Sequence, residues 1–174
     1  LASINGNGSL EHCQEISLKV AANLEKIHDG KILGVKTGFP NLDGDDLSIR
    51  NGELTILGAR PSVGKSALAW QIAVNSKVNA AFYSQEMNSE TLLMRELSKT
   101  TGLSSSDLSK KTEAQKAVYG LKQISKLPIW IDDSQGKSGG DIFRSAKRFA
   151  AVRNLGLIVV DYLQLLNFSG SASR

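Results

Sequence analysis

The 174-residue chain has a single cysteine, only two histidines and no long apolar run. One cysteine, Cys13, excludes an internal disulfide framework and suits a reducing compartment. Nothing approaches about eighteen consecutive apolar residues, and the N-terminal residues show no charged stretch followed by an apolar one, so neither a membrane span nor a signal peptide is indicated. His12 and His28 lack partners at metal-ligand spacing, so a transition-metal site is unsupported. We expect a soluble cytoplasmic protein.

Basic residues exceed acidic ones only modestly, 21 against 17, which gives a net charge of +4. This balance permits a polyanionic partner but provides no tail-like basic run. With 41% hydrophobic residues, the chain can bury one sizeable core and carry one appendage.

The most informative stretch is ELTILGARPSVGKSALAWQIA, residues 53–73. Its apolar residues 54–57 predict a buried strand, residues 60–64 a tight loop, and Lys65 with Ser66 the start of a helix. A strand, a loop and a helix in this order predict a phosphate-binding loop, because backbone N–H groups and the helix dipole both favour an anion there.

Within this loop the chemistry can be assigned residue by residue. Lys65 would reach the β- and γ-phosphates of ATP, and the Ser66 hydroxyl would bind Mg²⁺. Gly64, without a Cβ, would let the backbone close round the phosphates. The strict pattern G-x-x-x-x-G-K-[ST] has glycine where this chain has Ala59, so a lysine and serine that merely begin a helix remain the alternative. The predicted nucleotide-binding residues are Ala59, Arg60, Pro61, Ser62, Val63, Gly64, Lys65, Ser66 and Ala67.

Helices and strands alternate through the rest of the chain, which predicts an α/β fold. Right-handed βαβ units would build a mostly parallel sheet with helices on both faces. The expected strands are 79–84, 129–131 and 157–160. Helices are expected from Asn88 or Ser89 to about Thr100, from the capping box Thr112-x-x-Gln115, with Ala114, Val118, Leu121 and Ile124 apolar, and from the capping box Ser138-x-x-Asp141 to about Arg153.

Before this core, residues 1–8 read as a flexible lead-in and residues 31–51 as irregular. Between them a helix is expected from its N-cap Ser9, with Gly30 as the stop and one apolar stripe, namely Cys13, Ile16, Val20, Leu24 and Ile27. This helix either packs on its own domain or is a linker that docks on a neighbouring subunit. The sequence leaves both open.

Two acids follow predicted strands at the edge of the sheet where ligands bind in such folds. Asp161 ends the apolar run LIVV and can hold the Mg²⁺ shell beside Ser66. Glu86 follows the strand 79–84 and can polarise a water that attacks ATP, although a helix-terminal acid pairing with the dipole is the alternative. Asp132 and Asp133 read as a turn and are taken as structural.

A basic face surrounds the helix expected over residues 141–153. We expect this face to be solvated, with contact to nucleic acid as the second interpretation. Its members are Lys137, Arg144, Lys147, Arg148 and Arg153.

Four segments together resemble a known family: GARPSVGKSALA, FYSQEMNSETLLMRE, LPIWIDD and LGLIVVDYLQLL. They are similar to the RecA-like C-terminal motor of DnaB-type replicative DNA helicases, as are TGFPNLDG and NGELTILGARP. The resemblance covers roughly residues 35–166 and accounts for Ala59, since this family typically has alanine there. Where the family usually has leucine this chain has Gln85, with little expected effect on hydrolysis.

The resemblance implies a hexameric ring that hydrolyses ATP with Mg²⁺ and translocates 5′→3′ on single-stranded DNA. It implies catalytic roles for Glu86 and Lys65, and Mg²⁺ contacts for Ser66 and Asp161. The ring would assemble through the linker helix and the ATPase interface, and primase and a helicase loader would be partners. We expect a lead-in and linker helix over residues 1–34 and a partial ATPase core over residues 35–174.

Two other functions fit the same residues. The chain could belong to a RecA-like recombinase or clock-type ATPase that assembles on ATP without unwinding DNA. It could also be a truncated, non-catalytic module whose assembly is gated by nucleotide. DNA strand separation and nucleotide turnover discriminate these from a helicase.

Overall fold

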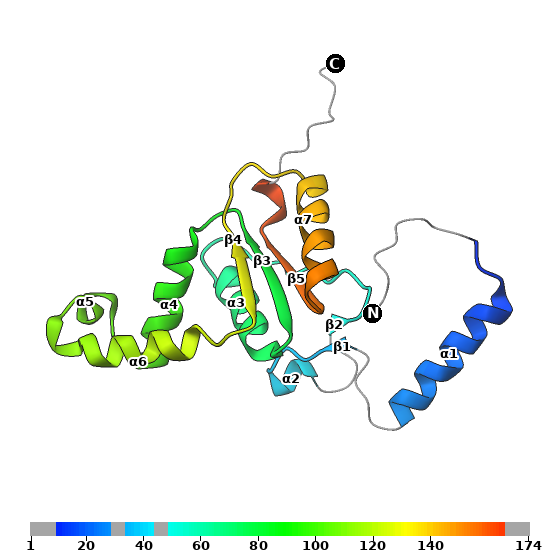
Figure 1. The fold of residues 1–174 in the computed structure, drawn as a ribbon, viewed down its shortest axis with the longest axis horizontal. Coiled ribbons are helices and arrows are strands. Elements are labelled where there is room, and N and C mark those ends of the chain that lie inside the picture. Colours follow the sequence, from blue (N-terminus) through cyan, green and yellow to red (C-terminus); the bar gives the residue numbers. More distant parts are fainter. Residues whose placement is uncertain (1–9, 29–33, 44–48, 166–174) are drawn as a thin grey trace, which may run out of the picture. The chain divides into compact units, whose positions relative to one another are not determined.

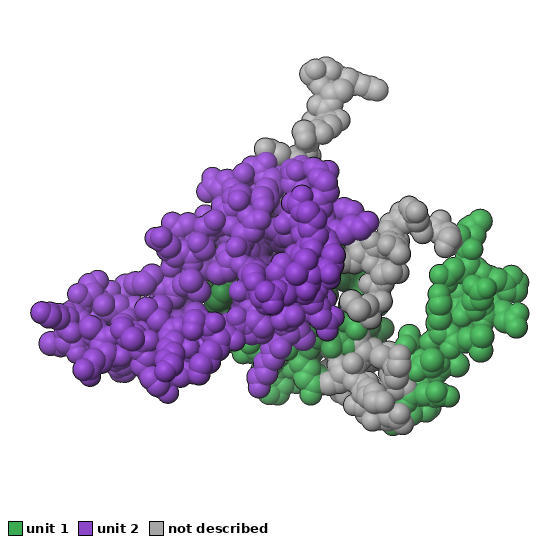
Figure 2. All heavy atoms as spheres, viewed as in Figure 1, with its two compact units in different colours: residues 1–76 green, residues 77–174 purple. Residues whose placement is uncertain are grey.

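The computed structural model describes residues 10–28, 34–43 and 49–165 of the chain. It divides into two compact units, Leu1–Ser76 and Lys77–Arg174, which Figure 2 colours separately. Among the helices that the structure describes, none combines the length and apolar character needed to span a bilayer. The expected division at residue 34 stays a prediction, and each unit is described by itself.

The first unit contains helices and one small antiparallel strand pair. Helix α1 begins at Cys13 rather than just after Ser9, which lies outside the described residues, as does the expected stop at Gly30. Residues 34–43, 49 and 50 were expected to be irregular, and this is wrong, because they contribute two paired strands and a one-turn helix. The elements are α1 (Cys13–His28), β1 (Gly34–Val35), α2 (Pro40–Asp43), β2 (Ile49–Arg50) and α3 (Lys65–Ser76).

Asp43 organises the loop between β1 and α2. Its Oδ1 accepts hydrogen bonds from the Thr37 N–H (2.7 Å) and hydroxyl (2.8 Å), and its Oδ2 accepts one from the Gly38 N–H (2.8 Å). Asn75 of α3 donates its Nδ2 to the Thr37 carbonyl at 3.2 Å. Gly38, at φ +76°, lies so close to Asn75 that a Cβ there would overlap the Asn75 side chain. The TGF segment is therefore attached to the C-terminal end of α3.

Residues 54–57 do not form the buried strand that their apolar composition predicts. The structure assigns them no strand, and Leu54 and Ile56 are 82% and 72% exposed. A strand exists through hydrogen bonds to a neighbour, and no described strand pairs with this segment. An apolar run was therefore not sufficient to predict a strand over residues 54–57.

The second unit is built on a parallel three-stranded sheet in the order β4-β3-β5 (Figure 1). Both neighbours of β3 run parallel to it, and Ser84 pairs in register with Asp161 at the carboxyl end. Parallel neighbours joined by helical connections confirm the α/β fold expected from the sequence. The strands are β3 (Asn79–Ser84), β4 (Ile129–Asp132) and β5 (Leu155–Asp161).

Helix α7 (Gly139–Val152) packs on one face of this sheet. Ile142 and Ala146 of the helix contact Ala81 and Tyr83 of β3 in a buried cluster. Alternation along β3 sends Phe82, which is fully buried, to the opposite face. The central strand is thus covered on both sides, as expected for a parallel sheet.

Between β3 and β4 the chain forms a helical arm that extends away from the sheet (Figure 1). Asn88 caps its first helix by accepting the Thr91 N–H at 2.8 Å, as the sequence predicts. The capping box expected at Thr112 is wrong, because Lys111–Glu113 is a 3₁₀ turn and α6 begins after Glu113 without a side-chain cap. The arm consists of α4 (Ser89–Thr101), α5 (Ser105–Leu108), the turn η1 (Lys111–Glu113) and α6 (Ala114–Ile124).

Helix α6 packs on α4 through Gly120. Gly120 is buried, and a methyl group there would lie 2.6 Å from Thr101 Cγ2 and 2.7 Å from Leu97 Cδ1 of α4. The lack of a side chain lets the two helices approach closely. Of the apolar residues expected in this helix, Ile124 is buried, whereas Val118 and Leu121 lie 64% and 48% exposed.

The capping box at the start of α7 is confirmed. The Ser138 hydroxyl accepts the Asp141 N–H at 3.2 Å, and Asp141 Oδ2 accepts the Ser138 N–H at 2.9 Å. The Ser138 hydroxyl and N–H, together with Arg144, lower the pKa of Asp141 from 3.8 to about 2.

This shift predicts an acid dependence of stability. Because the pKa of Asp141 is lower in the folded state, its ionised form contributes stability above about pH 4. That contribution is lost as the pH falls toward 2, where the folded carboxylate protonates. In urea titrations, the stability advantage of the wild type over Asp141→Asn should shrink between pH 4 and pH 2. An advantage that is constant from pH 7 to pH 2 would contradict this role.

Candidate functional site

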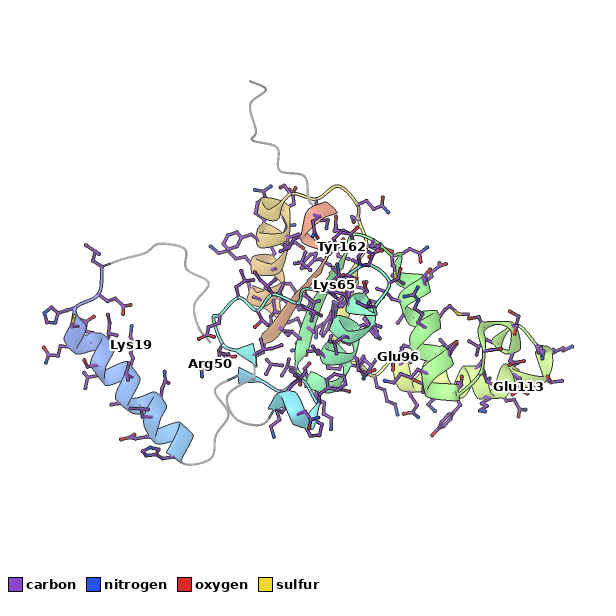
Figure 3. The ribbon with its side chains drawn as sticks, turned by 180° about the vertical axis from the view of Figure 1, so that it is seen from behind. Lys19, Arg50, Lys65, Glu96, Glu113 and Tyr162 are labelled. Carbon is purple, nitrogen blue, oxygen red and sulfur yellow. The ribbon has the colours of Figure 1, made fainter. Side chains whose placement is uncertain are left out.

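The loop before α3 contains two residues with left-handed backbone. Ser62 and Gly64 adopt positive φ values of 64° and 98°. The Gly64 carbonyl accepts the Leu68 N–H at 2.9 Å, which closes the first turn of the helix. Lys65 is the first residue of α3 (Figure 3), and both Lys65 and Ser66 are half-buried.

A phosphate fits this end of α3. The first N–H groups of a helix point out of its N-terminus and carry the positive end of the dipole. Residues 59–64 are exposed, so a ligand has access to the loop. The left-handed φ at Gly64 favours glycine, which accounts for the residue type there. All nine predicted nucleotide-binding residues belong to this loop and first turn, and their contact with nucleotide stays a prediction.

In the second unit, Asp161 lies at the carboxyl end of β5. It is 2% exposed, and its main-chain oxygen accepts the Gln85 N–H at 2.7 Å. Its Oδ2 is buried without a hydrogen-bond partner in the described part of the chain. A buried carboxylate oxygen without a partner is costly unless a cation or donor meets it. The residue therefore fits a role toward Mg²⁺.

The described residues contain no cluster of side chains that could enclose a metal ion. Over residues 10–28, 34–43 and 49–165, no three His, Cys, Asp or Glu side chains gather where they could share a metal ion. Mg²⁺ is commonly held by one or two protein groups, with water and substrate phosphates supplying the rest. Asp161 of the second unit and Ser66 of the first each carry an oxygen of the type that Mg²⁺ accepts, and their contact with Mg²⁺ stays a prediction.

Glu86 follows β3 directly and is exposed. Its segment is folded back on the strand, because the Ser84 hydroxyl donates to the Met87 carbonyl at 2.6 Å and accepts the Met87 N–H at 3.3 Å. The register of β3 and β5 places Ser84 beside Asp161. The structure therefore brings Glu86 and Asp161 to one edge of the sheet, whereas Lys65 and Ser66 belong to the first unit.

Two residues of this edge were not recognised from the sequence. Asp133, taken as a turn residue, accepts the Ser89 N–H on Oδ2 at 2.8 Å. The amide and hydroxyl of Ser89 lower the pKa of Asp133 below its usual value. Gln85 is 4% exposed and donates its Nε2 to the Ser134 carbonyl at 3.0 Å. Both bonds join residues far apart in the chain, so no local pattern predicts them.

The basic face of α7 is largely engaged within the chain. Lys137 pairs with Asp132, and Arg144 pairs with Asp141 at 2.7 Å. The Arg153 guanidinium lies 5.5 Å from the Trp130 ring centre. The solvated interpretation and the contact with nucleic acid both stay predictions.

Comparison with known proteins identifies the family to which the chain belongs. The family model of the DnaB-like helicase C terminal domain matches residues 34–174. The chain belongs to the DnaB-like helicase family. The match begins at β1 and includes the loop before α3, Glu86 and Asp161. Membership of this family implies a nucleotide-binding domain, and it confirms the resemblance drawn from the sequence.

Two curated relatives of the chain, both replicative DNA helicases, agree with this family assignment. The chain is 34% identical to the replicative DNA helicase DnaB of Geobacillus stearothermophilus, over 97% of this chain and 39% of that protein. It is 32% identical to the replicative DNA helicase DnaC of Bacillus subtilis strain 168, over 98% and 40%. The chain thus spans about two fifths of the length of these curated relatives.

Two solved structures share the fold. The ATPase domain of G40P superposes with a TM-score of 0.82 at 24% identity, over 95% of this chain and 62% of that one. A DnaB-like replicative helicase, solved in a study of its interactions with primase, superposes with a TM-score of 0.78 at 23% identity, over 95% and 42%. At these identities the likeness establishes the fold, which is that of a DnaB-family ATPase domain.

Proposed function

We propose that the chain is the nucleotide-hydrolysing part of a replicative DNA helicase. The full-length protein would be a hexameric ring that uses ATP to translocate 5′→3′ on single-stranded DNA. The observation that carries this proposal is the family match over residues 34–174, which includes every predicted site residue. The backbone of the loop at Gly64 and the buried, unpartnered oxygen of Asp161 support it independently.

In the proposed reaction the chain binds ATP, orients its γ-phosphate and polarises the attacking water. The N-terminus of α3 and Lys65 hold the ATP phosphates, which fixes the γ-phosphate for attack. Glu86 accepts a proton from the attacking water and so makes it a better nucleophile. Ser66 and Asp161 would hold Mg²⁺, which neutralises charge on the phosphates when it is bound.

The proposed ring needs contacts between copies, and two exposed apolar surfaces support this. On α1, Ile16, Val20 and Leu24 form a stripe and are 44%, 51% and 50% exposed. On α6, Val118 and Leu121 are exposed as well. We propose that the α1 stripe of one copy packs on the α6 surface of the next.

Primase and a helicase loader are proposed partners of the full-length protein. The solved helicase studied with primase is a relative in fold and supports the first of these. Single-stranded DNA remains the proposed substrate of translocation.

Strand separation tests the function. The full-length protein should separate forked duplexes that carry a free 5′ tail, and only with hydrolysable ATP. A fork with only a 3′ tail is the matched control and should stay annealed. Lys65→Ala should abolish separation, because the phosphates lose their cation.

Two results would favour the other functions. ATP turnover with assembly on DNA but without strand separation would support a recombinase-like or clock-type ATPase. Nucleotide binding without turnover, even with DNA in excess, would support a non-catalytic assembly module.

A further inference from the structure

We propose that Asp133 and Gln85 are positioning residues that hold Glu86 in place for ATP hydrolysis. This inference rests on the proposed function, because the position of Glu86 matters for hydrolysis only if Glu86 is the catalytic glutamate. The loop that follows β4, residues 133–134, would act as a clamp on the segment that follows β3, residues 85–89. The sequence around Asp133 is typical of a turn, and the residue type at position 85 was expected to have little effect on hydrolysis, so this role is additional for both residues.

The two side-chain bonds bracket Glu86. On one side of it, Gln85 Nε2 donates to the Ser134 carbonyl at 3.0 Å. On the other side, the Ser89 N–H donates to Asp133 Oδ2 at 2.8 Å. The main chain of Gln85 is fixed as well, because its N–H donates to the Asp161 carbonyl at 2.7 Å. Glu86 is therefore an exposed residue within a short segment that is held at both ends.

The loop after β4 does not need these bonds for its own shape. Asp132 Oδ1 accepts the Ser134 N–H at 3.1 Å, and Asp132 also pairs with Lys137. The capping box then begins α7 at Ser138. The loop is thus held by its own contacts. The bonds from Asp133 and Ser134 then fix the segment that carries Glu86 relative to this loop.

Helix α4 does not need Asp133 either. Its N-cap is Asn88, which accepts the Thr91 N–H at 2.8 Å. The bond from Ser89 to Asp133 is an additional connection, and it comes from a different strand connection 44 residues away. Asp133 satisfies the Ser89 N–H, a different donor of the first turn from the Thr91 N–H that Asn88 accepts, and it does so from outside the helix. A bond of this kind fixes the start of the helix, and the residues before it, against the loop after β4.

Gln85 has a feature that packing alone does not explain. It is 4% exposed, and its Oε1 is buried without a partner among the described residues. Leucine has a similar volume and would fill the site without burying an unsatisfied oxygen. The amide retains one advantage over leucine here, which is the hydrogen bond to the Ser134 carbonyl.

The test compares kcat with nucleotide binding in the full-length protein. Asp133→Ala should lower kcat for ATP about tenfold or more, because small displacements of a catalytic group are costly. The affinity and stoichiometry for a fluorescent ATP analogue should stay within about twofold, since the phosphate-binding loop is unchanged. Asp133→Asn keeps an oxygen acceptor for Ser89 and should restore most of kcat.

Gln85→Leu alone should lower kcat less, about threefold, because the bond to Asp133 remains. Combined with Asp133→Ala it should lower kcat by more than the product of the two single effects, since each bond compensates for loss of the other. Asp107→Ala, which removes a hydrogen-bonded aspartate from the helical arm, is the matched control and should leave kcat unchanged.

Three outcomes separate this inference from the proposed function. If Glu86→Gln leaves kcat unchanged, the catalytic role of Glu86 and the clamp both fail. If Glu86→Gln abolishes turnover but Asp133→Ala keeps kcat within twofold, only the clamp is overturned. The clamp is also overturned if kcat and the amount of bound nucleotide fall in parallel, because that result reports loss of folded protein.

Discussion

Glu86→Gln is expected to lower the rate of ATP hydrolysis by about 10²–10⁴-fold, the usual contribution of a general base. The glutamine has the same shape but cannot accept the proton of the attacking water. Nucleotide affinity should change little, because the phosphates are held by the loop before α3. Phosphate release at saturating ATP and DNA, with the binding of a fluorescent ATP analogue, measures both quantities in the full-length protein.

Glu90→Gln is the matched control for this substitution. Glu90 is an exposed acid in the first turn of α4 and interacts with the same helix dipole. If Glu86 served only the dipole, both variants would lose a similar small stability, about 0.3–1 kcal/mol, and both would hydrolyse ATP normally. That pair of results would refute the catalytic role.

The second large effect concerns assembly of the ring. Val20→Glu with Leu24→Glu should dissociate the hexamer at micromolar concentration and reduce ATPase activity strongly. Each apolar side chain that is buried at an interface contributes about 1.5–3 kcal/mol, and a charge there adds a desolvation cost. Sedimentation velocity of the full-length protein measures the hexamer fraction.

Ala22→Glu places a negative charge on the side of α1 opposite Val20 and Leu24, where the chain is exposed, and should leave the hexamer intact. Val118→Glu on α6 should reproduce the dissociation, because it alters the proposed receiving surface. A doubly substituted protein that sediments like Ala22→Glu would show that the α1 stripe is not an interface.

Features set by neighbouring residues could be predicted from the sequence. The box formed by Ser138 and Asp141, the cap at Asn88 and the strand before Glu86 all depend on side chains within a few residues. The place of Asp161 at the carboxyl end of a strand could be predicted for a similar reason, because it ends an apolar run. These features depend on hydrogen bonds between residues close in the chain and on the pattern of apolar residues, and the sequence shows the residue types that produce both.

Features set by tertiary contact could not be predicted. The apolar residues of α6 do not reveal from the sequence which of them pack: Ile124 is buried and Val118 and Leu121 are exposed, while Gly120 makes the close approach to α4. Residues 54–57 have the composition of a strand, but strand formation depends on a partner elsewhere. Gln85 and Asp133 were missed because their partners lie 49 and 44 residues away.

The bonds between residues 85–89 and 133–134 affect which positions of this site can change among homologous sequences. Gln85 bonds to a main-chain carbonyl, and Asp133 bonds to a main-chain N–H. Any amino acid at position 134 supplies the carbonyl, and any except proline at position 89 supplies the N–H. Residues 134 and 89 can therefore change without breaking the contact, so paired substitutions across homologous sequences would not reveal it. Asp133 would be constrained without a covarying partner, whereas position 85, where the family usually has leucine, would not be constrained to glutamine.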